Sequence, residues 1–107
     1  MKITNVEPIV VVAPLKETRL VSTGLMTHTY ATLVKVHTDE GLQGIGECLA
    51  RSAPEAAAAV VEKALRPVVV GQDPFNVELI WDKMYGVLRA RGHSKGFMLE
   101  AMAGVDI

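Results

Sequence analysis

The chain has 107 residues, half of them apolar, and its 11 basic and 12 acidic residues give a net charge of −1. This size suits one small domain, and the balanced charge, without a basic stripe, argues against a nucleic-acid partner. No apolar run approaches the roughly 18 residues that a membrane span needs. The single cysteine excludes an internal disulfide and is typical of a reducing compartment, so we expect a cytoplasmic protein.

The first predicted element is a β-strand that begins near Ile3 and contains the β-branched run from Ile9 to Ala13. Pro8 and Pro14 bracket this run. Proline cannot donate a hydrogen bond to a neighbouring strand, so we expect this strand at an edge of the sheet.

We expect a long loop from Leu15 to Thr29, because this stretch follows neither a period of two nor a period of 3.6. It is rich in Ser, Thr and Gly. Long loops in compact domains are usually functional or disordered. The apolar content favours a loop that packs on a ligand or another domain, and a loop that covers its own sheet is the alternative. The apolar residues are Leu20, Val21, Leu25 and Met26.

The stretch from Tyr30 to Cys48 predicts a β-hairpin around a turn at residues 39–41. Gly41 is expected in the left-handed conformation that only glycine adopts without cost. Gly44 and Gly46 share one face of the return strand, where the missing side chains allow another backbone to approach. With the first strand this hairpin gives a three-stranded antiparallel sheet that needs a helix on one face. The alternating faces carry Thr32, Val34 and Val36 on one side and Leu33, Lys35 and His37 on the other.

A helix is predicted after the hairpin, with Ser52 as its N-cap and Glu55 completing a capping box. Pro54 is tolerated in the first turn, and a run of four alanines follows. Pro67 should end or kink the helix two residues earlier. Gly71 is the expected stop of the segment.

Asp73 and Pro74 predict the start of a second helix, because an acid at the N-cap and a proline at the first helical position are both favoured. An apolar stripe of period 3.6 follows and is the strongest periodic signal in the chain. At this spacing we interpret the stripe as core rather than as a binding surface. Its members are Val77, Ile80, Trp81, Met84, Tyr85 and Leu88.

A last helix is predicted from Phe97 to Ile107, where apolar residues recur at helical spacing. Neither a capping glycine nor a cation marks its end. We therefore expect the chain to be part of something larger.

The residues that carry chemistry do not form a catalytic set. The three histidines lack the spacing of metal ligands, and no phosphate-binding glycine motif is present. Cys48 is interpreted as a buried structural thiol. Glu47 follows the glycine-rich strand and is interpreted as a partly exposed carboxylate at a strand end. The residues by themselves predict a packed α+β domain with one unusual loop.

Three motifs that occur together and in order indicate a family: TLVKVHTDEGLQGIGEC, GQDPFNVELIWDKMYGVLRARG and AMAGVDI. Together they resemble the N-terminal capping domain of the mandelate racemase/muconate lactonizing enzyme branch of the enolase superfamily, over almost the whole chain. The resemblance implies an α+β fold in which a three-stranded antiparallel sheet precedes a helical bundle. It implies that residues 1–95 form the capping domain and that residues 96–107 begin the segment leading into a (β/α)₇β barrel, which this sequence lacks.

The resemblance also implies a function for the whole enzyme. In this family the barrel supplies three acidic Mg²⁺ ligands and the acid/base Lys or His residues, which remove a proton α to a carboxylate. We therefore expect a Mg²⁺-dependent racemase, cycloisomerase or acid-sugar dehydratase. This chain alone lacks the metal ligands and the acid/base residues, so we assign it no catalytic residue and expect it to bind no metal. The expected partners are a carboxylate-bearing small molecule and further copies in a homo-oligomer.

Substrate contacts are implied for two capping loops. The stretch Leu15 to Thr29 matches the first loop of the family, and residues 49–52 match the second. Arg51 suits an anionic or polyhydroxylated ligand, because arginine recognises carboxylates with two hydrogen bonds. An ordinary loop side chain is the alternative at each position. The candidates are Arg19, Thr23, Met26, His28 and Arg51.

The alternative hypothesis is a function without catalysis. The domain can instead stand alone as an interaction or oligomerisation module without catalysis. Such a module would bury its exposed helix and loop faces against itself or a partner. The sequence identifies neither the substrate nor which of the three reactions takes place.

Overall fold

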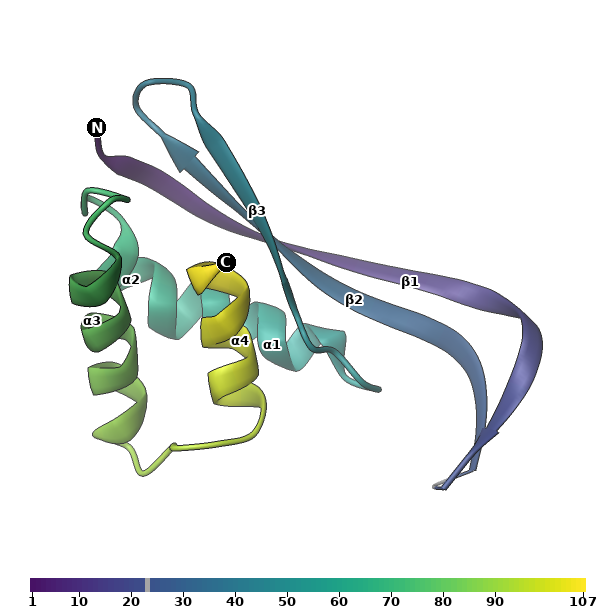
Figure 1. Ribbon diagram of the computed structural model, residues 1–107. Coiled ribbons are helices and arrows are strands. Elements are labelled where there is room, and N and C mark those ends of the chain that lie inside the picture. The colour runs from purple at the N-terminus through teal and green to yellow at the C-terminus, as the bar shows by residue number, and fades with distance from the viewer. Residues whose placement is uncertain (23) are drawn as a thin grey trace.

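The computed structural model describes residues 1–22 and 24–107, and Figure 1 shows a twisted sheet packed against a layer of helices. This arrangement confirms the predicted α+β fold with its three-stranded antiparallel sheet. In the described ranges, no helix is long and apolar enough to cross a membrane. The elements are β1 (Ile3–Val21), β2 (Gly24–Thr38), β3 (Gln43–Cys48), α1 (Pro54–Val60), the π-helical turn η1 (Val61–Leu65), α2 (Arg66–Val69), α3 (Val77–Arg89) and α4 (Phe97–Asp106).

The strand order is β1-β2-β3, so β1 lies at an edge as predicted and β2 lies in the centre. β1 pairs with β2 from Ile3 opposite Thr38 to Val21 opposite Gly24. β3 pairs only with the part of β2 from Thr32 to His37. Beyond Thr32, β1 and β2 continue as a two-stranded ribbon, which Figure 1 shows extending away from the helices. We call residues 11–22 and 24–31 the arm.

The prediction of a loop from Leu15 to Thr29 is wrong, because most of this stretch belongs to β1 and β2. Its aperiodic sequence has a structural cause. The register shifts between the pair Pro14–His28 and the pair Arg19–Met26, so residues 15–18 of β1 lie opposite Thr27 alone. Extra residues in one strand interrupt the alternation of side chains, and a period of two is lost there.

The hairpin of β2 and β3 follows the prediction closely. Gly41 has φ of 82°, in the left-handed region, and the turn is closed by the Thr38 amide, which donates to the Leu42 carbonyl at 3.1 Å. Thr32 and Val34 are fully buried on the face that meets the helices. The Thr32 hydroxyl donates a 2.7 Å hydrogen bond to the carbonyl of Pro54, which ties the sheet to the start of α1.

The predicted capping box at Ser52 and Glu55 is wrong. The N-cap position is occupied by Ala53, and no side chain caps the helix. Ser52 stands one residue too early, because an N-cap side chain has to reach the amides two or three positions further on. The cap residue is set instead by Pro54, which begins the helix.

Pro67 interrupts the first helix without ending it. A proline ring clashes with the carbonyl four residues earlier, which in this chain belongs to Lys63. The helix widens into the π-helical turn over Val61–Leu65 and then continues as α2. The interruption predicted near Leu65 is thus a π-turn, and the segment stops at Gly71, whose φ of 91° is that of a glycine terminator.

The second long helix, α3, begins three residues later than predicted, at Val77. Asp73 closes a turn: its carboxylate accepts from the amide of Phe75 at 2.9 Å, and its carbonyl accepts from Asn76 at 3.0 Å. The predicted apolar stripe is core only in part. Val77 in the first turn is 57% exposed and Trp81 is 40% exposed, whereas Tyr85 is partly buried and packs against the core, which corrects the interpretation of the whole stripe as core. The fully packed members are Ile80, Met84 and Leu88.

Helix α4 lies directly on strand β3. A Cβ atom added to Gly46 would overlap the carbonyl oxygen of Gly104, and one added to Gly104 would overlap the sulfur of Cys48. The predicted close approach of a second backbone is thus confirmed at Gly46. At Gly44 a Cβ would meet nothing within 4 Å. The thiol of Cys48 donates to the carbonyl of Ala101 at 3.6 Å, between the two elements.

We predict that Gly46→Ala lowers the free energy of unfolding by about 2–3 kcal/mol, since the added methyl group forces α4 off the strand. Gly44→Ala is the matched control on the same strand and should change stability by less than about 1 kcal/mol. Urea unfolding followed by circular dichroism measures both. Equal midpoints for the two variants would contradict the packing of α4 on β3.

Candidate functional site

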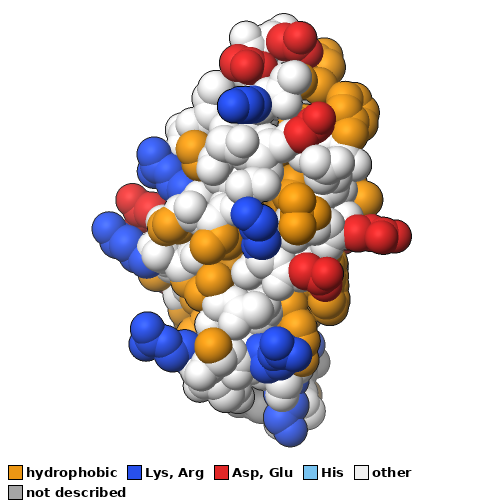
Figure 2. Space-filling view, turned by 90° about the vertical axis from the view of Figure 1, so that its left-hand side faces the viewer, with side chains coloured by type: hydrophobic (Ala, Val, Ile, Leu, Met, Phe, Trp, Pro, Cys, Tyr) orange, Lys and Arg blue, Asp and Glu red, His pale blue; other side chains and the backbone are white. Residues whose placement is uncertain are grey.

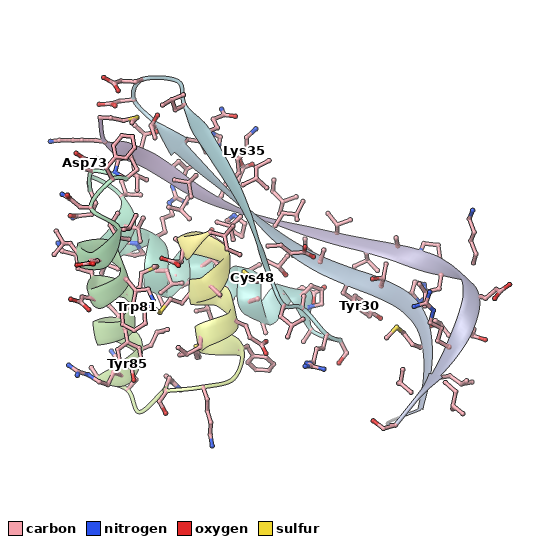
Figure 3. All side chains as sticks on the ribbon, in the orientation of Figure 1. Tyr30, Lys35, Cys48, Asp73, Trp81 and Tyr85 are labelled. Carbon is pink, nitrogen blue, oxygen red and sulfur yellow. The ribbon has the colours of Figure 1, made fainter. Side chains whose placement is uncertain are left out.

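The arm and the loop after β3 meet at one end of the sheet. β3 ends at Cys48, which lies opposite Thr32, where the third strand stops and the arm begins. Residues 49–53 therefore leave the sheet beside the root of the arm. In Figure 3, Tyr30 lies on β2 beyond Cys48, in the direction of the arm. The arm and residues 49–53, which are distant in sequence, thus lie at the same end of the molecule.

Three predicted site residues lie together on the arm. Arg19 and Met26 are direct cross-strand partners, so their side chains lie on one face of the ribbon. His28 is two positions from Met26 on the same strand and therefore belongs to that face as well. Arg19 and His28 are exposed, and Met26 is 37% exposed. Thr23, the remaining candidate at the arm, lies outside the described residues.

The face of the arm continues toward the body of the domain through Tyr30. The ring of His28 lies 6.5 Å from the ring of Tyr30, and its Nδ1 atom is 2.9 Å from the hydroxyl of Thr27. Tyr30 is not among the predicted site residues, because in the sequence it marks only the start of a strand. Its position two residues after His28 on a strand is the signal that places it on this face.

Arg51 lies in the exposed bend after β3, at the root of the arm. In residues 1–22 and 24–107, the single ion pair joins His37 Nε2 to Glu7 at 3.0 Å, and neither Arg19 nor Arg51 takes part in it. Two guanidinium groups at one end of the sheet are therefore left without a carboxylate of the described chain. Such groups bind anions by charge-assisted hydrogen bonds.

The outer part of the arm carries exposed leucines. Leu20 and Leu25 are cross-strand partners, and they are 82% and 71% exposed. A two-stranded ribbon is only marginally stable in water without a third element. Apolar side chains at its tip are typical of a surface that is completed by contact with something else.

The described residues do not fit a metal site or a nucleophile. Over the ranges 1–22 and 24–107, no three His, Cys, Asp or Glu side chains are grouped closely enough to hold a metal ion. Cys48 is fully buried, and this burial raises the pKa of its thiol from the ordinary 9.0 to about 11. Its interpretation as a structural thiol is confirmed.

Comparison with known proteins decides the family. Residues 3–107 match the description "Mandelate racemase / muconate lactonizing enzyme, N-terminal domain". The chain belongs to this family. The resemblance predicted from the three motifs is confirmed, and so is the fold of an N-terminal enolase-type domain.

Among members of the family, the D-galactarolactone cycloisomerase of Agrobacterium fabrum is 41% identical over 75 residues, which are 70% of this chain and 19% of that protein. The arabinonate dehydratase of Saccharolobus solfataricus is 32% identical over 84 residues, which are 78% of this chain and 22% of that protein. The solved structure of the N-succinyl Arg/Lys racemase of Bacillus cereus aligns with a TM-score of 0.83 at 29% identity, covering all of this chain and 28% of that one. The chain thus spans about a fifth of the curated relatives it matches.

We predict that the Cys48 thiol of the native chain does not react with 5,5′-dithiobis(2-nitrobenzoate) at pH 8 and reacts fully once urea unfolds the chain. Folding raises the pKa of the Cys48 thiol. The contribution of the protonated thiol to the free energy of unfolding is therefore complete below pH 9.0 and is lost as the pH rises toward about 11. The free energy of unfolding should fall over this interval, and Cys48→Ala should remove that part of the fall. Equal reaction rates in native and unfolded chain would contradict the burial.

Proposed function

We propose that this chain caps the substrate site of a Mg²⁺-dependent enzyme that removes a proton α to a carboxylate, as a racemase, cycloisomerase or acid-sugar dehydratase. The observation that carries the proposal is the arm, a ribbon that leaves the packed body and presents Arg19, Met26 and His28 on one face. Membership of the family and the short span of the chain relative to its relatives support it.

The side chains have distinct roles in this proposal. Arg19 and Arg51 bind the carboxylate or hydroxyl groups of the substrate from two sides. Met26 and the leucines of the tip exclude water from the closed site. His28 and Thr23 supply hydrogen bonds that distinguish one substrate from another. None of them moves the proton: that step and the metal belong to a barrel domain, to which these residues contribute no ligand.

The surface for the barrel domain lies at the other end of β3. An apolar hollow of about 300 Å³ opens between the turn of the β2–β3 hairpin, the start of α3 and the end of α4. Exposed apolar side chains surround it, and burying them against a second domain would be favourable. Residues 96–107 then form the segment that leads into that domain. The hollow is lined by side chains that include Leu42, Ile45, Phe75, Val77 and Ile107.

The names of the relatives narrow the substrate class. One is a cycloisomerase of a sugar-acid lactone and another is a sugar-acid dehydratase. A carboxylate-bearing small molecule, with several hydroxyl groups for the arm to contact, is the substrate class that we propose. The single buried thiol suits a reducing compartment, and we propose that the enzyme works in the cytoplasm.

A chimera tests the proposal. Residues 1–107 replace the matching N-terminal segment of the Agrobacterium cycloisomerase, and turnover of sugar acids is measured with and without Mg²⁺. We expect Mg²⁺-dependent turnover, and we expect Arg19→Ala or Arg51→Ala to lower kcat/KM by about tenfold or more, mainly through a higher KM.

Arg66→Ala is the matched control, because this exposed arginine lies on α2, away from the arm. It should leave kcat/KM unchanged. If the larger replacement does not fold, a second chimera that carries only residues 14–28 of this chain is used instead. A folded, Mg²⁺-dependent chimera whose kcat/KM is the same in both arginine variants would rule out the capping role.

A further inference from the structure

Strand β1 has an open edge, because it forms the border of the sheet and pairs with β2 on one side only. The N–H and C=O groups along such an edge are a template to which another chain can add a strand. The run of residues 9–12 is accessible from both faces, since consecutive side chains of a strand point to opposite sides. β-branched, uncharged runs of this kind pair readily with other chains. The exposed fractions are 37% for Ile9, 38% for Val10, 43% for Val11 and 48% for Val12.

The two prolines of β1 determine which backbone groups face the open edge. Pro8 and Pro14 lie in one stretch of the β1–β2 ladder that has no register shift between them. Opposite pairs in an antiparallel ladder alternate between a hydrogen-bonded and a non-hydrogen-bonded kind. Because proline has no N–H, both prolines belong to pairs of the second kind. Val10 and Val12, at every second position between them, therefore direct their N–H and C=O groups to the open edge as well.

Other parts of the chain close this edge on either side of the prolines. The amide of Ile3 donates to the carbonyl of Gln72 at 2.9 Å, and the amide of Gly71 donates to the carbonyl of Ile3 at 2.8 Å. After Pro14, the register shift at residues 15–18 interrupts the ladder, and a bulge of this kind bends a strand away from regular pairing. Within the described chain, the stretch between the two prolines has no backbone partner on its outer side.

Charge does not protect this stretch. On the face of the molecule seen in Figure 2, acidic and basic side chains are interspersed among hydrophobic ones. Charges distributed in this way keep protein chains apart. Residues 9–13 read Ile-Val-Val-Val-Ala and carry no charge. The protection of the edge therefore has to come from the backbone.

We propose that Pro8 and Pro14 act as gatekeepers, which keep the open edge of β1 from pairing with other chains. Each proline lacks the donor that a joining strand needs, and its ring occupies the place of that N–H. Between them, a joining strand finds donors only at Val10 and Val12, which are few of the main-chain hydrogen bonds on which strand addition depends. The proposal is independent of the capping role, because it concerns the edge of β1 and not the face of the arm.

Hydrogen exchange of the native chain tests the geometry on which the proposal rests. The amides of Ile9 and Val11 bond to β2, whereas those of Val10 and Val12 face solvent at the edge. We expect the second pair to exchange at least about tenfold faster than the first. Equal protection of all four amides would overturn the proposal, because the edge would then already be paired.

The double variant Pro8→Val/Pro14→Val tests the role of the prolines on the chain as it is. Valine restores both N–H groups and favours a strand. We expect thioflavin-T-positive aggregates at about 100 µM, within the range in which unpaired strand edges associate. Their initial rate of formation should exceed that of the native chain by about tenfold or more. Thioflavin T reports growing sheets, so a discrete oligomer does not produce this signal.

Two further variants locate the effect. Val12→Lys, added to the double variant, should return the rate to that of the native chain, because a lysine on an edge strand blocks strand addition. Pro67→Val is the matched control, since this exposed proline lies on helix α2 and not on a strand. It gains the same side chain and should not aggregate. Urea unfolding of each dilute variant establishes that the fold is retained.

Two results with the variants would overturn the proposal. One is a folded double variant that stays free of thioflavin-T-positive aggregates. The other is a double variant that aggregates as fast with Val12→Lys as without it, which would place the growing surface away from β1. If the double variant does not fold, Pro14→Val alone is measured, and the same two outcomes decide.

Discussion

The direct contact between the backbones of β3 and α4 determines the shape of this domain. Gly46 and Gly104 lack the side chains that would hold the two elements apart, and the buried thiol of Cys48 fills the space beside them. The helical layer is therefore fixed over the short stretch of sheet where β3 is present. Because β3 ends at Cys48, the strands that continue past it have no third strand beside them, and Figure 1 shows them extending away from the helices. The arm is the consequence, and it is the part of the domain to which we assign the proposed contact with a ligand.

The sequence predicted those parts of the fold that depend on local chemistry. The edge position of β1 followed from its prolines, the turn at Gly41 from the need for a positive φ, and the close approach at Gly46 from a missing side chain. The failures have equally specific causes. The bulge opposite Thr27 removed the alternation by which a strand is recognised, so the arm was interpreted as a loop.

Helix boundaries and exposure were harder to predict. A serine near Pro54 carried the signature of a cap, but the position of the proline decided where α1 begins. The apolar stripe of α3 has the right period for a core helix, yet a period does not say which flank has a neighbour. Ile80, Met84 and Leu88 are covered by this domain, whereas Trp81 is not.

For the candidate site, the sequence predicted residues and the structure supplied their arrangement. Arg19 and Met26 were grouped by family resemblance within an apparent loop, and strand pairing makes them direct neighbours. Tyr30 was missed because its spacing of two residues from His28 indicates a shared face only once both residues are known to lie on one strand. The roles assigned to these side chains and to Arg51 remain predictions.

Hydrogen exchange followed by NMR tests most directly whether a packed body carries a separate, weakly held arm. We expect amides of β2 between residues 33 and 37, and amides of α4, to exchange only by global unfolding, while amides near residues 19–21 and 25–26 exchange at least about a hundredfold faster. Equal protection along the whole length of β1 and β2 would contradict this expectation, because the arm would then be a rigid continuation of the sheet.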